Sequence, residues 1–219
     1  MSGVTYASEI LSVVFFLCFI KRNKKEGLWI IFLSCVFSIV AEMTALIITR
    51  VHKSYMFYFW ATYTIVEYSL FAFFFYNTFK NKRTRYIPVI GTLLFYGIVS
   101  ITFYQKSTRN FDSLSASMEG ILMIIYSIVF LYGQITSPEI IYVYNTKRFW
   151  IVIAIFLYFS STLFLFLFAA DIASPQYSSY WIINNLFEIL KNTLFCISFA
   201  MKKNETKQNS LNNYTPDML

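Results

Sequence analysis

Long apolar runs separated by short polar connections make up most of this chain. About 20 consecutive apolar residues are needed for a helix to cross the hydrocarbon core of a bilayer. Runs of this approximate length occupy residues 4–20, 28–49, 56–79, 86–104, 114–135, 149–170 and 180–201. The pattern therefore predicts an all-α, polytopic membrane protein with seven transmembrane helices.

The composition agrees with this pattern. Of the 219 residues, 58% are hydrophobic and 13% are charged, whereas a soluble domain carries roughly 25% charged residues. The composition therefore excludes a soluble globular protein, and the lipid bilayer is the first partner that we expect. Seven crossings use most of the chain, so we predict one membrane domain over residues 1–203 and a short tail over residues 204–219.

Basic residues indicate how the predicted helices are oriented. Of the 18 lysines and arginines, all but Lys191 lie outside the apolar runs, and most of them fall in alternate connections and in the tail. Connections rich in lysine and arginine stay in the cytoplasm. We therefore predict a multi-pass protein of the cell (inner) membrane, with the N-terminus outside and the C-terminus inside. Since the basic residues set orientation, the net charge of +7 does not predict a nucleic-acid partner.

An internal repeat relates the two ends of the predicted domain. An offset of 121 residues aligns Trp29 with Trp150, Trp60 with Trp181 and Glu67 with Glu188. The repeat halves cover about 4–80 and 114–203 in the same orientation, and the helix at 86–104 links them. This is a 3+1+3 arrangement, and parallel repeats place binding sites between the halves. The alternative is chance, because tryptophan gathers at membrane interfaces in any such protein.

The repeat and the linker helix give the chain an architectural resemblance to a broad group of seven-helix 3+1+3 proteins. That group includes the PQ-loop and SWEET-type carriers and, by proposed kinship, the opsins. The Pro-Gln pair of those carriers is absent from this sequence. The resemblance therefore implies the architecture and assigns no site residue.

A second resemblance comes from local motifs. The run Arg148-Phe149-Trp150-Ile151 precedes Tyr158-Phe159, and Asn184-Asn185 and Glu188 then precede a basic tail. In these motifs the chain resembles uncharacterised seven-helix bacterial membrane proteins and sensor input modules. The resemblance implies that membrane sensing is a possible function.

Acidic residues inside the apolar runs are the main functional signal. A charge at the bilayer centre costs roughly 2.5–3.5 kcal/mol, so each such residue needs a partner, a cavity, water or a proton. In the predicted orientation these residues lie near the middle or toward the outside, which predicts a polar cavity that opens outward. Five of the eleven acidic residues belong to this set, namely Glu9, Glu42, Glu67, Glu119 and Glu188.

The last apolar run carries a polar stripe. Residues at these spacings share one face of a helix, and the stripe consists of Asn184, Asn185, Glu188, Lys191 and Asn192. One interpretation is a buried ion pair that fixes helix packing. The other is a ligand-binding or proton-relay site, which is favoured because one lysine does not neutralise five carboxylates.

Carboxylates that share a dehydrated cavity favour protons or a cationic ligand. Aromatic faces for a cationic ligand are available on Tyr58, Trp60, Tyr63, Tyr68, Tyr126 and Tyr158, although lipid contact is the simpler role for each. We therefore predict a sensory or receptor-like protein that binds a small polar or cationic ligand, or protons, in the outward-facing cavity, with Glu67 and Glu188 as its central acids. Its short tail implies that a separate signalling partner protein carries the output.

The alternative is a small proton-coupled solute transporter. The repeat favours a transporter, but helices broken by proline or glycine near the membrane centre are typical of transport sites. No run has a proline in its middle, and Pro88 is expected in the first turn of the helix at 86–104.

The sequence gives little support for a catalytic function or for a bound cofactor. The single histidine, His52, lies in a connection, so no histidine pair is available for a metal, and no glycine-rich phosphate loop is present. A lysine in the seventh helix, such as Lys191, is where an opsin binds retinal as a Schiff base. Four residues before the lysine an opsin has a carboxylate, whereas this chain has Phe187. We therefore expect no metal and no cofactor, and an enzyme is not favoured, although carboxylates alone could catalyse a hydrolysis.

Overall fold

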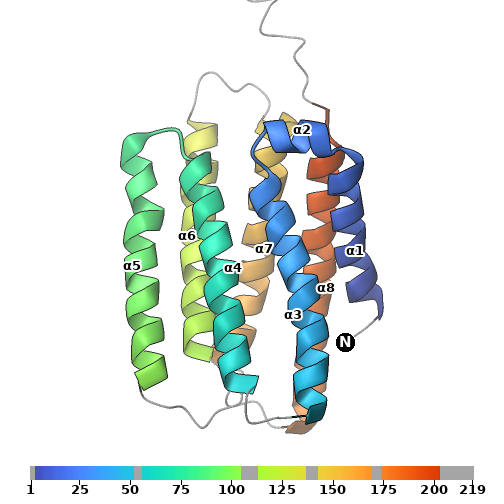
Figure 1. The fold of residues 1–219 in the computed structure, drawn as a ribbon. Helices are drawn as coiled ribbons and strands as arrows, with labels where there is room; N and C mark the ends of the chain where they lie inside the picture. Colours follow the sequence, from blue (N-terminus) through green and yellow to red (C-terminus); the bar gives the residue numbers. More distant parts are fainter. Residues whose placement is uncertain (1–2, 52–55, 105–112, 137–142, 169–173, 203–219) are drawn as a thin grey trace, which may run out of the picture.

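The computed structural model describes residues 3–51, 56–104, 113–136, 143–168 and 174–202. Over these ranges the chain forms α-helices and one short 3-10 helix, with no strand (Figure 1). The prediction of an all-α fold is confirmed. The elements are α1 (Gly3–Cys18), α2 (Ile20–Lys25), α3 (Trp29–Val51), α4 (Met56–Thr78), α5 (Lys82–Tyr104), α6 (Ser113–Ile135), η2 (Val143–Asn145), α7 (Lys147–Phe168) and α8 (Ser174–Ala200).

Each predicted run corresponds to one long helix, but the described ranges contain eight α-helices and not seven. The additional helix, α2, occupies the connection that the sequence pattern assigned to a basic loop. It ends in a Schellman motif, in which the amide of Gly27 donates to the carbonyl of Lys24 and the amide of Leu28 donates to that of Asn23. Gly27 has a φ of 76°, a left-handed conformation that favours glycine.

Four of the described helices are long and apolar enough to cross a membrane. They are the segments Trp29–Arg50, Lys82–Tyr104, Leu114–Ile135 and Lys147–Leu165. Helix α1 has 16 residues and is shorter than a usual span. Helices α4 and α8 have 23 and 27 residues but are not among these four segments.

Pro88 does not lie where the sequence pattern placed it. Helix α5 begins at Lys82, so Pro88 lies inside the second turn and not in the first. Proline has no N–H and crowds the turn that precedes it. The prediction of a first-turn proline was wrong because the basic residues before position 86 continue the helix outside the apolar run.

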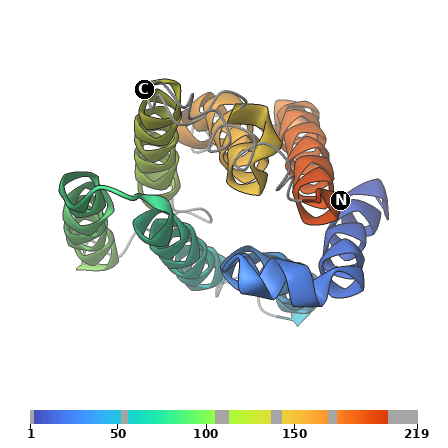
Figure 2. The ribbon, with the colours of Figure 1, turned by 90° about the horizontal axis from the view of Figure 1, so that it is seen from above.

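Six of the long helices form a closed ring when the bundle is viewed along its axis (Figure 2). Their order around the ring is α1, α3, α4, α6, α7 and α8, and α8 packs against α1 to close it. Helix α5 lies outside the ring and packs against α4 and α6. The interior of the bundle is therefore bounded by six helices.

Aromatic side chains fill the half of the ring next to the basic connections. Phe16 lies near the end of α1, where its ring stacks on Phe32 at 4.5 Å and meets Phe199 edge-on at 5.2 Å. Phe75 in the last third of α4 packs against Tyr126 of α6 in the same way. All of these side chains except the half-buried Phe32 are close to fully buried, so this half of the ring has a dense apolar core.

Helix α2 ties the ends of α7 and α8 together. The Arg22 guanidinium donates to the carbonyl oxygens of Phe199 and Ala200 at 3.0 and 2.7 Å, which satisfies carbonyls at the end of α8. Lys147 is 4% exposed, and its ammonium donates to Asn23 at 2.8 Å and pairs with Glu26 at 3.1 Å. The sequence pattern placed Lys147 in a connection outside the apolar runs, and the structure buries it against α2 at the start of α7.

Helix α5 is attached to the ring by a close contact at Gly91. The hydroxyl of Tyr126 lies against Gly91 where a Cβ atom would be. The same hydroxyl hydrogen-bonds that of Tyr68 at 2.9 Å, and the Tyr68 ring stacks on Phe95 of α5 at 3.9 Å. The absence of a side chain at Gly91 therefore lets α5 approach α6.

Substituting Gly91→Ala is expected to lower the free energy of unfolding by about 1–2 kcal/mol, because the added methyl overlaps the Tyr126 hydroxyl. Thermal unfolding of the purified protein measures the change. Gly97→Ala on the same helix is the matched control, since its Cβ would meet open space. In a Tyr126→Phe background the effect of Gly91→Ala should shrink, and an unchanged effect would contradict the contact.

Candidate functional site

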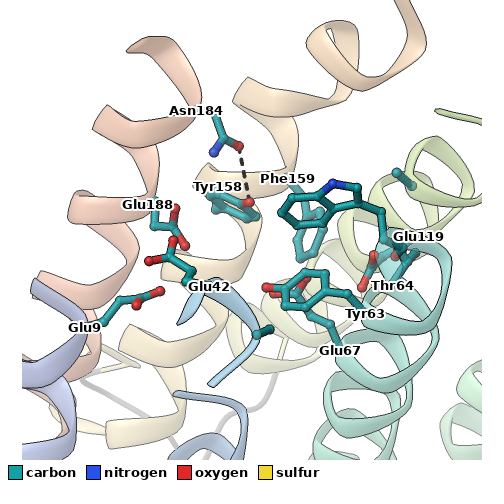
Figure 3. Close-up of a pocket in the computed structure, with 13 residues that line it drawn as sticks. Glu9, Glu42, Tyr63, Thr64, Glu67, Glu119, Tyr158, Phe159, Asn184 and Glu188 are labelled. Atoms are coloured by element: carbon teal, nitrogen blue, oxygen red, sulfur yellow. Dashed lines mark hydrogen bonds between the residues drawn. The ribbon is translucent and has the colours of Figure 1, made fainter. Parts of the chain in front are cut away.

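Five glutamates from five ring helices converge inside the bundle (Figure 3). They are Glu9 of α1, Glu42 of α3, Glu67 of α4, Glu119 of α6 and Glu188 of α8. Their side chains belong to residues that are between 2% and 7% exposed. The sixth ring helix, α7, contributes the Tyr158 hydroxyl to the same place.

These residues line one cavity of about 60 Å³. A water molecule needs roughly 10–15 Å³ of such space, whereas pockets for drug-sized ligands measure roughly 300–1,000 Å³. The cavity therefore accommodates a few water molecules or a small cation. Besides the five glutamates and Tyr158, its lining consists of Ala41, Trp60, Tyr63, Thr64, Ala116, Phe159 and Asn184.

Lys191 places one positive charge beside the cavity. Its ammonium lies 4.0 Å from a carboxylate oxygen of Glu67 and 3.7 Å from one of Glu188. It also lies 4.2 Å from the centre of the Tyr158 ring, which adds a cation–π contact. Glu67 and Glu188 are the two acids that an offset of 121 residues aligns in the sequence, so one lysine contacts both members of this pair.

A second group of carboxylates lies on the α1 side of the cavity, and we call Glu9, Glu42 and Glu188 the carboxylate triad. One oxygen of each lies within 4.8 Å of the others, and Figure 3 shows the three groups pointing toward one another. Neither oxygen of Glu9 has a hydrogen-bond partner among the described residues, and Glu42 Oε2 also has none. A buried carboxylate without a donor is destabilising, so the triad is not explained by packing.

Glu67 and Glu119 lie on the opposite side of the cavity, near Tyr63 and Thr64 (Figure 3). Glu67 faces Lys191, whereas Glu119 Oε1 has no hydrogen-bond partner among the described residues. The Lys191 ammonium thus lies between the two sides of the cavity, since it contacts Glu67 on one side and Glu188 of the triad on the other.

The polar stripe of α8 divides between the cavity and the helix contacts. Asn184 lines the cavity, and its Oδ1 accepts a hydrogen bond from the Tyr158 hydroxyl at 3.3 Å. Asn192 turns to α1 and donates to Ser8 at 3.1 Å. Asn185 does not belong to the lining of this cavity. Of the five stripe residues, Asn184 and Glu188 thus line the cavity and Lys191 adjoins it.

The aromatic residues that the sequence offered as cation–π faces also divide. Trp60, Tyr63 and Tyr158 line the cavity. Tyr58 is 49% exposed on the outside of the bundle, and Tyr68 and Tyr126 pack at the contact with α5 described above.

Four lining residues were missed by sequence reasoning, namely Ala41, Thr64, Ala116 and Phe159. Thr64 and Ala116 each precede a buried glutamate by three residues, and this spacing places two residues on the same helical face. Spacing from the glutamates could therefore have identified these two. Ala41 and Phe159 are neighbours in sequence of lining residues, and no spacing marks them.

Comparison of this chain with models of protein families, with curated proteins and with solved structures finds no match. The geometry of the buried glutamates, of the cavity and of Lys191 is what bears on the function.

Proposed function

We propose that this protein is a sensory or receptor-like membrane protein that binds a small cation, or protons, in an outward-facing cavity lined by carboxylates. One observation carries the proposal: five buried glutamates from five helices line a single small cavity, and one lysine adjoins it. Five carboxylates and one ammonium leave an excess of negative charge that a cation or protons would neutralise.

The alternative interpretation, a buried ion-pair network that fixes packing, accounts for only part of the site. It explains Lys191 with Glu67 and Glu188. It does not explain Glu9, because a carboxylate that stabilised the fold would accept hydrogen bonds, and neither Glu9 oxygen has a partner among the described residues.

The arrangement of helices supports a seven-span 3+1+3 layout with α5 as the linker. If α1, α3 and α4 are exchanged with α6, α7 and α8, respectively, the order of helices around the ring stays the same. The contacts α1·α3, α3·α4 and α4·α6 then correspond to the contacts α6·α7, α7·α8 and α8·α1. All six of these contacts are present. A pseudo-two-fold relation between parallel halves, with α5 outside it, is the arrangement that the aligned tryptophans and glutamates predict.

The position of the cavity supports an opening to the outside. Tyr63 and Asn184 lie in the first halves of α4 and α8, and Glu9 lies in the first half of α1. These helix ends point away from the basic connections (Figure 1), which the positive-inside rule assigns to the cytoplasm. The aromatic core described above closes the cytoplasmic half of the ring.

A small proton-coupled transporter is the second candidate. The contact of Lys191 with both Glu67 and Glu188 favours it, because these acids belong to opposite repeat halves. A rocking motion of one half against the other would shift Lys191 toward one acid, which would give two states of the site.

Thiol labelling from each side of oriented membrane vesicles tests the proposed function. Cys18, Cys35 and Cys196 are first removed, and single cysteines are then introduced as Tyr63→Cys or Asn184→Cys. We expect a membrane-impermeant reagent to label both positions from the outside only. The matched control is a chain that keeps only Cys196, which is 6% exposed in the packed half and should remain unlabelled.

The other outcomes of this experiment decide between the candidates. Labelling from both faces that responds to a proton or solute gradient would replace the sensory function by the transporter. Labelling from neither face would mean that the carboxylates are a sealed network, and the proposed binding site would be wrong.

A further inference from the structure

We infer that the carboxylate triad of Glu9, Glu42 and Glu188 is a binding site for one divalent cation that prefers oxygen ligands, such as Mn²⁺, Mg²⁺ or Ca²⁺. This inference rests on the proposed function, since it names the ligand of the same cavity. It goes further in selecting three of the five glutamates and one class of ion.

The distances within the triad suit a single ion. Divalent cations of this class bind oxygen at roughly 2.0–2.6 Å, so two ligand oxygens on the same ion lie at most about 5 Å apart. One oxygen from each member of the triad lies within 4.8 Å of the others. The three carboxylates come from α1, α3 and α8, which are neighbours in the ring, and each carboxylate points toward the other two (Figure 3).

Glu9 provides independent evidence for a ligand. It is 2% exposed, it lines the cavity, and neither of its oxygens has a hydrogen-bond partner among the described residues. Its two nearest carboxylates could act as hydrogen-bond partners only if one group of each pair were protonated. A bound cation would satisfy the oxygens of all three groups at once.

The charge of the triad matches a divalent ion. Three carboxylates carry three negative charges, and Lys191, which also faces Glu67, partly compensates that of Glu188. A divalent cation would neutralise two of the three charges. Ligands that are all carboxylates, with no imidazole or thiolate among them, favour hard cations over zinc or copper. The cavity of about 60 Å³ leaves room for water molecules to complete the coordination shell.

Glu67 and Glu119 are not part of this site. They lie on the other side of the cavity, and neither belongs to the group of carboxylates whose oxygens lie within 4.8 Å of one another. Glu119 is therefore the matched control, because Glu119→Gln removes the same charge from the same cavity at a distance from the triad.

Manganese binding tests the inference. The full chain is placed in nanodiscs of neutral phosphatidylcholine, treated with EDTA and titrated with Mn²⁺, whose free concentration is followed by electron paramagnetic resonance. We expect one saturable Mn²⁺ site per chain that Mg²⁺ or Ca²⁺ competes for and that empty nanodiscs lack. Glu9→Gln, Glu42→Gln and Glu188→Gln should each weaken binding at least tenfold, whereas Glu119→Gln should weaken it clearly less than any of these three.

Three results would overturn the inference. These are the absence of a saturable site in the unsubstituted protein, a loss with Glu119→Gln equal to that with the triad variants, and binding that no triad variant weakens. Thermal unfolding of the same samples with Na⁺ or methylammonium distinguishes a failure of the divalent-cation site from a failure of the proposed function. If one of these monovalent cations stabilises the protein while Mn²⁺ does not bind, the divalent site is wrong and the proposed cation-binding cavity remains.

Discussion

Replacing Lys191 with methionine is expected to lower the free energy of unfolding by about 3–5 kcal/mol, the usual loss when one partner of a buried ion pair is removed. The ammonium is within 4.0 Å of Glu67 and 3.7 Å of Glu188, and both pairs are almost fully buried. Methionine fills a similar volume, so the loss reports charge and not packing. After the substitution, the cavity would hold five glutamates with no ammonium beside them.

Unfolding of the protein in detergent, induced by heat or by added denaturant, measures this effect. Lys202→Met is the matched control, since Lys202 is exposed and should change stability by less than about 0.5 kcal/mol. Adding Glu188→Gln to Lys191→Met should recover part of the loss, because one unpaired carboxylate is then gone. A loss below 1 kcal/mol for Lys191→Met would contradict the ion pairs as described.

The long helices could be predicted from the sequence because apolar runs of this length have few alternatives in a membrane. Helix α2 could not be predicted in the same way. It is six residues long and rich in lysine and arginine, and its stability depends on contacts with distant segments, such as Arg22 with the end of α8 and Asn23 with Lys147. Isolated helices of this length are unstable in water, so no local signal marks it.

The five glutamates could also be predicted, since a carboxylate inside an apolar run has a high free-energy cost unless the fold compensates it. How the five glutamates divide between the two sides of the cavity could not be predicted. The carboxylate triad and the Glu67 side of the cavity are set by the rotation of each helix and by the closure of α8 onto α1. Asn184 and Asn185 illustrate this limit, because they are adjacent in sequence and only Asn184 lines the cavity.

The size of the cavity could not be predicted from the sequence either. The aromatic residues in the runs were offered as cation–π faces for a cationic ligand, but several of them pack against each other or against α5, and the cavity measures about 60 Å³. This volume is what shifts the expected ligand from a small polar molecule toward an inorganic cation or protons.

Removing two carboxylates of the triad is expected to stabilise the protein. Without a bound cation, the fold must either hold Glu9 and Glu42 charged beside Glu188 or take up protons that the unfolded chain does not need, and both alternatives are unfavourable. Glutamine at both positions removes this cost and adds amide donors for the remaining carboxylate. In EDTA, we expect Glu9→Gln with Glu42→Gln to raise the free energy of unfolding by about 3 kcal/mol.

Glu67→Gln provides the matched contrast in the same cavity. Glu67 faces Lys191 at 4.0 Å, so its neutralisation weakens an existing ion pair and should destabilise the protein. Opposite signs for the two variants would distinguish carboxylates that serve a ligand from a carboxylate that serves the fold.

The most direct test of the central claim, that the carboxylate triad exists to bind a cation, is therefore one comparison of unfolding temperatures in EDTA. The claim predicts that the chain with Glu9→Gln and Glu42→Gln unfolds several degrees above the unsubstituted protein. If this variant unfolds at a lower temperature, Glu9 and Glu42 stabilise the fold themselves, and the claim is contradicted.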